Sequence, residues 1–360
     1  MKRLVVVAPN WLGDAVMALP AIADLRRARP DASIAVAARP SVAPLFTLTP
    51  EADEVVTLND NRPSALAGRE ALLLLPNSFQ SALTAKRARV PERWGYSTDW
   101  RGFLLTRSVP RPPSGLHQIA YYQRLVAALG FENGPSAPRI DAAPAVREAG
   151  AGALRKAGWD GRTPVVALAP GAAFGSSKRW APQAFADLAA GLANDGVTTV
   201  LVGASADRAT AAEVVRAGSG RARFIDLVGQ TDVPTLAGVL TSCRALVAND
   251  SGALHLAAAL GVSVTAVYGP TDERLTAPVA RGQWPAAGES PITGHRSLTT
   301  EHRSLTTDHR SLTTDHRSLV TVMTNPVWCR PCWLRDCPLD RECMEGIDAA
   351  RVLDETRRML

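Results

Sequence analysis

The chain has 360 residues, of which 46% are hydrophobic and 21% charged, and its formal net charge is +6. This length exceeds one typical domain, and the hydrophobic content excludes a disordered chain and suits two ordinary cores. No apolar run approaches 18 residues, which argues against a membrane span, and the run ending at Ala8 is too short for a signal peptide. We therefore expect a cytoplasmic protein of two α/β units.

The N-terminal half predicts strands alternating with helices. In chain order these are a strand at Leu4–Ala8, a helix at about Ala15–Arg29, strands at Ser33–Ala38, Val55–Leu58 and Ala71–Leu75, and a helix at Ile119–Leu129. Short, uniformly apolar strands between amphipathic helices favour a parallel sheet covered on both faces. The proline-containing stretch Asn133–Ala145 then indicates the approach to an interdomain linker.

The segment from Lys86 to Arg111 is basic and aromatic. It holds seven Lys and Arg residues, including Arg93 and Arg101, against two acidic residues, with aromatic side chains between them. Such a segment suits an anionic partner, namely a phosphorylated glycolipid, a membrane surface or nucleic acid. The alternative is an ordinary solvated face in a chain that uses Arg in place of Lys. No nucleic-acid-binding motif accompanies the basic residues, so we expect no nucleic-acid partner.

The second half repeats the alternation more clearly. The predicted elements are strand Val165–Ala169, helix Pro182–Asn194, strand Thr198–Val202, helix Ala206–Ala217, strand Arg223–Leu227, helix Val233–Ser242, strand Ala245–Ala248, helix Gly252–Leu260 and strand Ser263–Tyr268. Five strands separated by four helices at short spacings predict a doubly wound sheet.

A repeat follows these elements. The heptapeptide HRSLTT(E/D) occurs three times from His295, and a fourth copy decays by Val322. A period of seven is typical of coiled coils, but each copy offers one strongly apolar residue, so no hydrophobic seam exists. We interpret 295–322 as a recently expanded surface insert. Its histidines allow a metal site as the alternative.

The loop PGAAFGSSKRW follows strand Val165–Ala169, and open α/β sheets bind ligands beyond the carboxyl ends of their strands. Glycine, hydroxyl and cationic residues there provide what a diphosphate needs. An ordinary α/β turn is the alternative. The candidate ligands in this loop are Gly171, Ser176, Ser177, Lys178 and Arg179.

A second polar loop, Asn249 to Gly252, follows strand Ala245–Ala248 and opens a helix. The Ser251 and Gly252 amides at a helix N-terminus favour an anionic leaving group, although Asp250 alone would be explained as a helix cap. His255 lies one turn further and could donate to a phosphate or pack in the core. Gly203 and Asp207 are weaker candidates for ribose or base contacts.

Asp14 ends the first strand-to-helix loop, which would face a cleft between two stacked α/β domains. A carboxylate there could serve as the general base that deprotonates an acceptor hydroxyl. A helix cap explains the same residue equally well. The loop lacks GxGxxG, and the chain lacks a Walker P-loop, which argues against a nicotinamide dehydrogenase and a P-loop nucleotidase.

Four cysteines, Cys329, Cys332, Cys337 and Cys343, cluster near the C-terminus, and Cys243 stands alone. Clustered thiols in a cytoplasmic protein favour structural zinc over disulfides, but the spacing lacks the paired CxxC form of zinc knuckles.

The segments PNWLGDAVMALPAI, PGAAFGSSKRWAPQAFADLA, VANDSGALHLAAALGVSVTAVYGPTD and CRPCWLRDCPLDRECM together resemble glycosyltransferase family 9, and within it the lipopolysaccharide heptosyltransferase II group. The resemblance covers nearly the whole chain apart from the insert. It implies a GT-B architecture, with two Rossmann-like domains facing across a cleft. It also implies metal-independent, inverting transfer of L-glycero-D-manno-heptose from ADP-heptose to the first heptose of the lipopolysaccharide inner core.

The resemblance implies that Asp14 is the base and that Lys178 faces the donor phosphates, with Asp250, Ser251, Gly252 and His255 beside the nucleotide sugar. Relatives often carry an acidic residue where this chain has Ala173. We expect the anionic acceptor on the N-terminal domain, with the enzyme at the cytoplasmic face of the inner membrane. The candidate acceptor-binding residues are Asn10, Trp11, Gly13, Arg93 and Arg101.

The expected domains are an acceptor-binding domain at 1–150, a nucleotide-sugar domain at 151–345 that carries the insert and the cysteine segment 329–343, and a C-terminal helix at 346–360. Three alternatives stay open because no residue identifies the heptose. They are a transferase for another nucleotide sugar, a nucleotide-sugar epimerase, and an inactive nucleotide-binding protein of the same fold.

Overall fold

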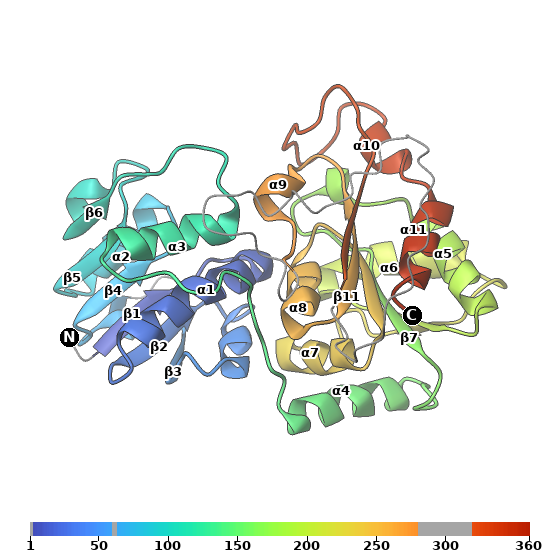
Figure 1. Ribbon diagram of the computed structural model, residues 1–360, viewed down its shortest axis with the longest axis horizontal. Coiled ribbons are helices and arrows are strands. Elements are labelled where there is room, and N and C mark those ends of the chain that lie inside the picture. The colour runs from blue at the N-terminus through green and yellow to red at the C-terminus, as the bar shows by residue number, and fades with distance from the viewer. Residues whose placement is uncertain (1–2, 60–62, 280–318) are drawn as a thin grey trace, which may run out of the picture.

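The computed structural model describes residues 3–59, 63–279 and 319–360. They form two α/β lobes side by side (Figure 1), each built on one six-stranded parallel sheet. The strand orders are β3-β2-β1-β4-β5-β6 and β12-β11-β10-β7-β8-β9. Each order is that of the doubly wound Rossmann fold, so the predicted α/β class with two facing Rossmann-like domains is confirmed.

The N-terminal lobe, blue to teal in Figure 1, extends the predicted pattern. Its strands are β1 (Arg3–Val7), β2 (Ser33–Ala38), β3 (Glu54–Thr57), β4 (Ala71–Leu74), β5 (Glu92–Tyr96) and β6 (Arg107–Val109), and its helices are α1 (Leu12–Ala28), α2 (Phe79–Arg87) and α3 (Gln118–Ala128). Strands β5 and β6 were not predicted, because Arg and Glu interrupt any apolar run there. Buried Trp94 and Tyr96 supply their core contacts instead.

The C-terminal lobe follows the predicted elements closely. Its strands are β7 (Val165–Ala169), β8 (Thr198–Leu201), β9 (Phe224–Asp226), β10 (Ala245–Asn249), β11 (Ser263–Tyr268) and β12 (Val320–Thr324). Its helices are α4 (Pro144–Lys156), α5 (Pro182–Asn194), α6 (Arg208–Ala217), α7 (Val233–Thr241), α8 (Gly252–Leu260), α9 (Glu273–Thr276), α10 (Glu342–Glu345) and α11 (Ala349–Arg357). Strand β12 is a sixth strand that sequence reasoning missed.

Helix α4 packs against α7 at a pair of glycines. A Cβ on Gly150 would lie 2.0 Å from the carbonyl carbon of Gly238, so the two helix backbones touch directly. The predicted boundary between residues 150 and 151 falls inside this helix. At the other end of the chain, α11 lies beside α5 (Figure 1) and contacts β11 through Thr356, whose Oγ1 is 3.4 Å from that of Thr265.

The predicted repeat insert lies outside the described residues as far as position 318. Its last residues lead into β12, which pairs in parallel with β11 at the edge of the second sheet. Val320 and Val322 of the decayed fourth copy pack against the core of the lobe, whereas Leu319 is exposed.

Candidate functional site

The predicted loops lie at the centre of the molecule, where the two lobes meet. The loop after β7 and the loop after β10 are neighbours, since β7 and β10 pair where the strand order of the second sheet reverses. Such a switch point is the usual ligand-binding edge of an open α/β sheet. The loop after β1 holds the same place in the first sheet, and α1 packs against α8 across the junction.

The contact between the lobes is close enough to require glycine on both sides. A Cβ at Gly13 would lie 2.8 Å from Cδ2 of His255, and one at Gly252 would lie 2.8 Å from Cβ of Leu12. The predicted acceptor-side residue Gly13 and the predicted donor-side residue Gly252 therefore hold the lobes together. Both roles follow from packing and were not visible in the sequence.

Lys178 and Asp250 form an ion pair across the two donor-side loops. Lys178 Nζ lies 2.5 Å from Asp250 Oδ2, and the two side chains are 12% and 8% exposed. Thr271, which follows β11, donates its hydroxyl to the same carboxylate oxygen at 2.8 Å. Asp250 is therefore bound by a cation and a hydroxyl from two other loops. Helix α8 has Ser251 at its N-cap position and no side-chain cap hydrogen bond, so the predicted explanation of Asp250 as a helix cap is wrong.

Asp14 lies within electrostatic reach of this pair, although it comes from the other lobe. Burial and the nearby Asp250 charge raise the pKa of its carboxyl, Lys178 partly offsets both effects, and the resulting pKa is about 6. Helix α1 begins at Leu12 without a side-chain cap, and within the described part of the chain the Asp14 carboxylate accepts no hydrogen bond. Asp14 is therefore not a cap, and its oxygens are free to accept a proton.

Asn249, to which sequence reasoning gave no role, joins the two donor-side loops. Its side-chain amide donates to the Pro170 carbonyl at 2.8 Å, and its side-chain oxygen accepts from the Trp180 backbone N–H at 3.1 Å. Because Asn249 is fully buried, these bonds fix the start and the end of the loop after β7. Its place directly before Asp250, in the NDSG motif, was the available signal.

Two predicted donor ligands have another role. The Ser176 hydroxyl donates to Asp336 Oδ1 at 2.7 Å, and the Ser177 hydroxyl donates to the Leu334 carbonyl at 2.5 Å. The predicted contact of these hydroxyls with the diphosphate is wrong, because both hydroxyls already donate to the cysteine segment. Residues far apart in the chain make these contacts, so spacing could not reveal them.

Arg179 and Ser251 keep unused hydrogen-bonding capacity. Arg179 Nε and Ser251 Oγ are buried without a hydrogen-bond partner among the described residues. Such groups are costly unless a ligand completes them. Their position in the two predicted donor loops fits donor binding. The exposed Ala173 lies in the same loop and contributes no polar group.

His255 is nearly buried, and desolvation lowers the pKa of its imidazole to about 4. At neutral pH it carries no charge and packs against Gly13 of the other lobe. Of its two predicted roles, packing is the one the structure supports.

Gly171, Gly203 and Asp207 form a unit of their own. A Cβ on Gly171 would lie 2.1 Å from the Asp207 carboxyl carbon, and Asp207 Oδ2 accepts from the Ala204 backbone N–H at 2.9 Å. Gly171 thus makes room for Asp207. Gly203 has a φ of 159°, near extended backbone, and its Cα lies beside the same carboxylate.

The predicted acceptor residues divide into two groups. Asn10 and Trp11 are exposed at the carboxyl end of β1, and Trp11 keeps 56% of its surface free. Arg93 lies near the amino end of β5, away from the junction, and binds the Leu104 carbonyl at 2.7 Å. Its predicted acceptor contact is therefore wrong.

The predicted acceptor contact of Arg101 is also wrong. Arg101 is fully buried and donates to the Tyr96 carbonyl at 2.9 Å, to the Pro76 carbonyl at 2.5 Å and to Ser81 Oγ at 3.0 Å. These bonds tie the loops after β4 and β5 together. The Arg101 Nη2 atom has no hydrogen-bond partner among the described residues, but the side chain is fully buried and exposes no surface to a ligand. Burial lowers the pKa of its guanidinium to about 10.

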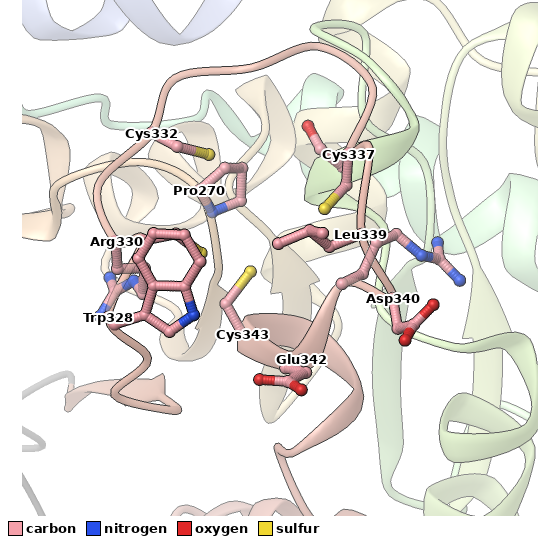
Figure 2. Close-up of a pocket in the computed structure, with 12 residues that line it drawn as sticks. Pro270, Trp328, Arg330, Cys332, Cys337, Leu339, Asp340, Glu342 and Cys343 are labelled. Atoms are coloured by element: carbon pink, nitrogen blue, oxygen red, sulfur yellow. The ribbon is translucent and has the colours of Figure 1, made fainter.

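The four C-terminal cysteines line one pocket with Pro270 and Trp328 (Figure 2). All are free thiols, and Cys343 is buried. Within residues 3–59, 63–279 and 319–360, no group of three or more His, Cys, Asp or Glu side chains is arranged to hold a metal ion. Zinc in this segment stays a prediction that metal analysis of the purified protein tests.

Comparisons with known proteins agree with this geometry. The family model of glycosyltransferase family 9 (heptosyltransferase) matches residues 64–289. Lipopolysaccharide heptosyltransferase 2 of Salmonella typhimurium is 28% identical over 302 residues, which are 77% of this chain and 86% of that protein. Lipooligosaccharide heptosyltransferase 2 of Haemophilus ducreyi is 29% identical over 78% and 86%. The structure of Escherichia coli ADP-heptose lipopolysaccharide heptosyltransferase II is 24% identical, with a TM-score of 0.77 over 100% of this chain and 98% of that one.

Proposed function

Because the chain belongs to glycosyltransferase family 9, we propose that it transfers L-glycero-D-manno-heptose from ADP-heptose to the first heptose of the lipopolysaccharide inner core. The similar relatives are heptosyltransferases of this kind, and the similar E. coli structure is that of an ADP-heptose lipopolysaccharide heptosyltransferase II. The observation that supports the proposal is the meeting of Asp14 from one lobe with the Lys178–Asp250 pair from the other.

The proposed reaction is a single displacement. The acceptor hydroxyl oxygen bonds to the anomeric carbon of the heptose, the bond from that carbon to the ADP oxygen breaks, and the hydroxyl proton passes to Asp14. Attack opposite to the leaving group inverts the anomeric centre. A carboxyl pKa of about 6 leaves Asp14 largely ionised at neutral pH yet basic enough to accept the proton.

The leaving ADP gains negative charge as the bond breaks, and fixed cations stabilise that charge. Lys178 supplies one such cation in the loop after β7, and the backbone N–H groups of Ser251 and Gly252 lie at the start of α8. These groups need no metal ion for their role, so we propose metal-independent transfer.

We expect the purified protein to add one heptose to a water-soluble, heptose-terminated core oligosaccharide when ADP-heptose is supplied, with or without EDTA. Mass spectrometry of the acceptor measures the gain. Parallel reactions with UDP-sugars test the alternative donors, and recovery of an isomerised donor without acceptor gain would indicate an epimerase. If neither the acceptor nor the donor changes in any of these reactions, the proposed transfer is overturned and the inactive nucleotide-binding protein is the remaining alternative.

We further propose that the enzyme works at the cytoplasmic face of the inner membrane, bound to its surface. No helix in the described part of the chain is long and apolar enough to cross a membrane. The support is an exposed aromatic and basic surface on the N-terminal lobe, which we define as Phe79, Lys86, Trp100 and Phe103. Trp100 is 93% exposed and Phe103 is 71% exposed.

This aromatic–basic surface is built at the carboxyl ends of β4 and β5. The Phe79 and Phe103 rings are 6.2 Å apart, and Lys86 Nζ lies 6.0 Å from the Phe103 centroid. Asp99 holds the two loops together by accepting from the Phe79 backbone N–H at 2.9 Å. Aromatic side chains beside cations suit the headgroup region of an anionic bilayer. The neighbouring Arg87 and Arg89 are exposed and add to the positive charge.

We expect the double variant Trp100→Ser/Phe103→Ser to bind phosphatidylglycerol vesicles at least about tenfold more weakly than the wild type. Full burial of one such ring contributes about 1.5–3 kcal/mol, so even partial insertion of both rings accounts for a loss of this size. Vesicle co-sedimentation measures this change. Trp328→Ser is the matched control, since Trp328 is 86% exposed on the other lobe. Equal loss in the control, or undiminished binding by the double variant, would contradict this surface.

A further inference from the structure

The cysteine segment, residues 329–343, packs directly on the loop after β7. A Cβ on Gly175 would lie 2.2 Å from the Arg335 carbonyl oxygen, and that oxygen accepts from the Ser177 backbone N–H at 3.1 Å. With the Ser176–Asp336 and Ser177–Leu334 bonds described above, two consecutive residues of the loop are hydrogen-bonded to residues 334–336, and Gly175 before them packs on the same segment. The cysteine segment therefore fixes the backbone that carries Lys178.

The same segment is bound to the loop after β11. The backbone N–H groups of Cys332 and Trp333 both lie 3.0 Å from the Pro270 carbonyl oxygen. Figure 2 shows the segment arching over this pocket, with Pro270, Cys332, Cys337 and Cys343 around it. Since Thr271 of this loop binds Asp250, the segment contacts both loops that hold the Lys178–Asp250 pair.

The side chain of Arg335, in this segment, lies against the loop that carries Lys178. Its guanidinium carbon lies 5.5 Å from the centroid of the Phe174 ring, and Lys178 Nζ lies 4.9 Å from the same centroid. One aromatic side chain in the loop after β7 is thus in contact with two cations. Arg335 is exposed and has no ion-pair partner among the residues the structure describes.

The charges at the junction favour a further cation beside Lys178. Lys178 is already paired with Asp250, and Asp14 adds a further carboxylate nearby. A donor diphosphate would therefore meet two carboxylates, the compensated Lys178 ammonium group and Arg179 of the same loop, so a further unpaired cation would strengthen its binding. Guanidinium groups bind phosphate oxygens through parallel hydrogen bonds, and an unpaired one gives up no protein partner when it does so.

We propose that Arg335 of the cysteine segment binds the diphosphate of the nucleotide-sugar donor beside Lys178. This inference rests on the proposed function, because it assigns a ligand group of that same donor. The Phe174 ring supports the guanidinium from one side, and the bonds to Ser176 and Ser177 set the position of its backbone. The cysteine segment is then part of the donor site and not only a structural appendage.

The test compares binding of ADP and of adenosine to the full-length protein by calorimetry. We expect Arg335→Gln to weaken ADP binding about tenfold, which matches the loss of one charged hydrogen-bonded contact, while adenosine binding stays unchanged. Arg335→Lys is expected to recover part of the loss, since it restores charge without the planar fork. The matched control is Arg358→Gln, because Arg358 is an exposed arginine on the terminal turn, paired with Glu355.

Three outcomes separate the hypotheses. If the wild type and Arg335→Gln bind ADP equally well, the role of Arg335 is overturned and the proposed function stands. Wild-type protein that binds no ADP removes the donor site and this inference with it. Equal weakening of ADP and adenosine binding in Arg335→Gln indicates a disturbed loop, and also overturns a diphosphate contact.

Discussion

Asp14→Asn is expected to reduce kcat by about 10²- to 10⁴-fold, which is the usual cost of losing a general base. Asn has nearly the same shape as Asp but does not accept the proton from the acceptor hydroxyl. Helix α1 should persist, because Asp14 provides no cap. Donor binding should also persist, since Lys178 and Asp250 lie on the other lobe. Steady-state kinetics with both substrates measures the change, and a rate near that of the wild type would refute the assignment.

The pH dependence provides an independent check on Asp14. Because its folded-state pKa is about 6, the wild-type kcat/KM should fall about tenfold per pH unit below that value as the base becomes protonated. The residual kcat/KM of Asp14→Asn should not show this fall at acidic pH. A wild-type profile that stays flat down to pH 5 would contradict Asp14 as the base.

As the pH rises from about 3.8 to 6, ionisation of Asp14 should lower the stability of the fold while it raises the activity. The folded-state pKa of Asp14 lies above the unfolded value of 3.8, so folding favours the protonated carboxyl. The cost of ionising Asp14 therefore develops between about pH 3.8 and 6 and is fully present at higher pH. Above pH 6, Asp14→Asn should be at least as stable as the wild type in denaturant unfolding. A less stable variant would show that Asp14 supports the fold.

Lys178→Ala should lower kcat/KM by about 10²- to 10³-fold, comparable to the loss of one preorganised group that stabilises developing negative charge. It should also weaken ADP binding, because the diphosphate loses a cation. Since the Lys178 charge lowers the pKa of Asp14, its removal should move the acidic limb of the pH profile to higher pH. Unchanged affinity for ADP would contradict the role.

The same substitution leaves Asp250 nearly buried without its cation, which typically costs about 3–5 kcal/mol. Lost activity could then reflect a damaged fold. The double variant Lys178→Ala/Asp250→Asn removes both charges and serves as the control. We expect it to recover most of the free energy of unfolding without recovering activity, whereas recovered activity would show that Lys178 acts only through the fold.

The C-terminal lobe was predicted well because its strands and helices carry their own local signals. Strands β7 and β11 and helices α5 and α8 have the predicted bounds, since each strand is a short apolar run and each helix is opened by Pro or Gly. The N-terminal lobe was predicted less completely. Strands β5 and β6 carry Glu92, Arg93 and Arg107, whose charges hide the strand pattern while neighbouring strands supply the burial.

The sequence by itself determined the fold class, the two polar loops and the choice of Asp14 and Lys178 as candidate site residues, because motif order and strand-end position are local properties. Only the tertiary structure decided which polar groups are free for a ligand. Ser176 and Ser177 find their hydrogen-bond partners far along the chain, as Ser177 does with Leu334, whereas Arg335 has no ion-pair partner among the described residues. A hydrogen-bonding group that folding has already satisfied gains little from a ligand, and that balance is set by contacts remote in sequence.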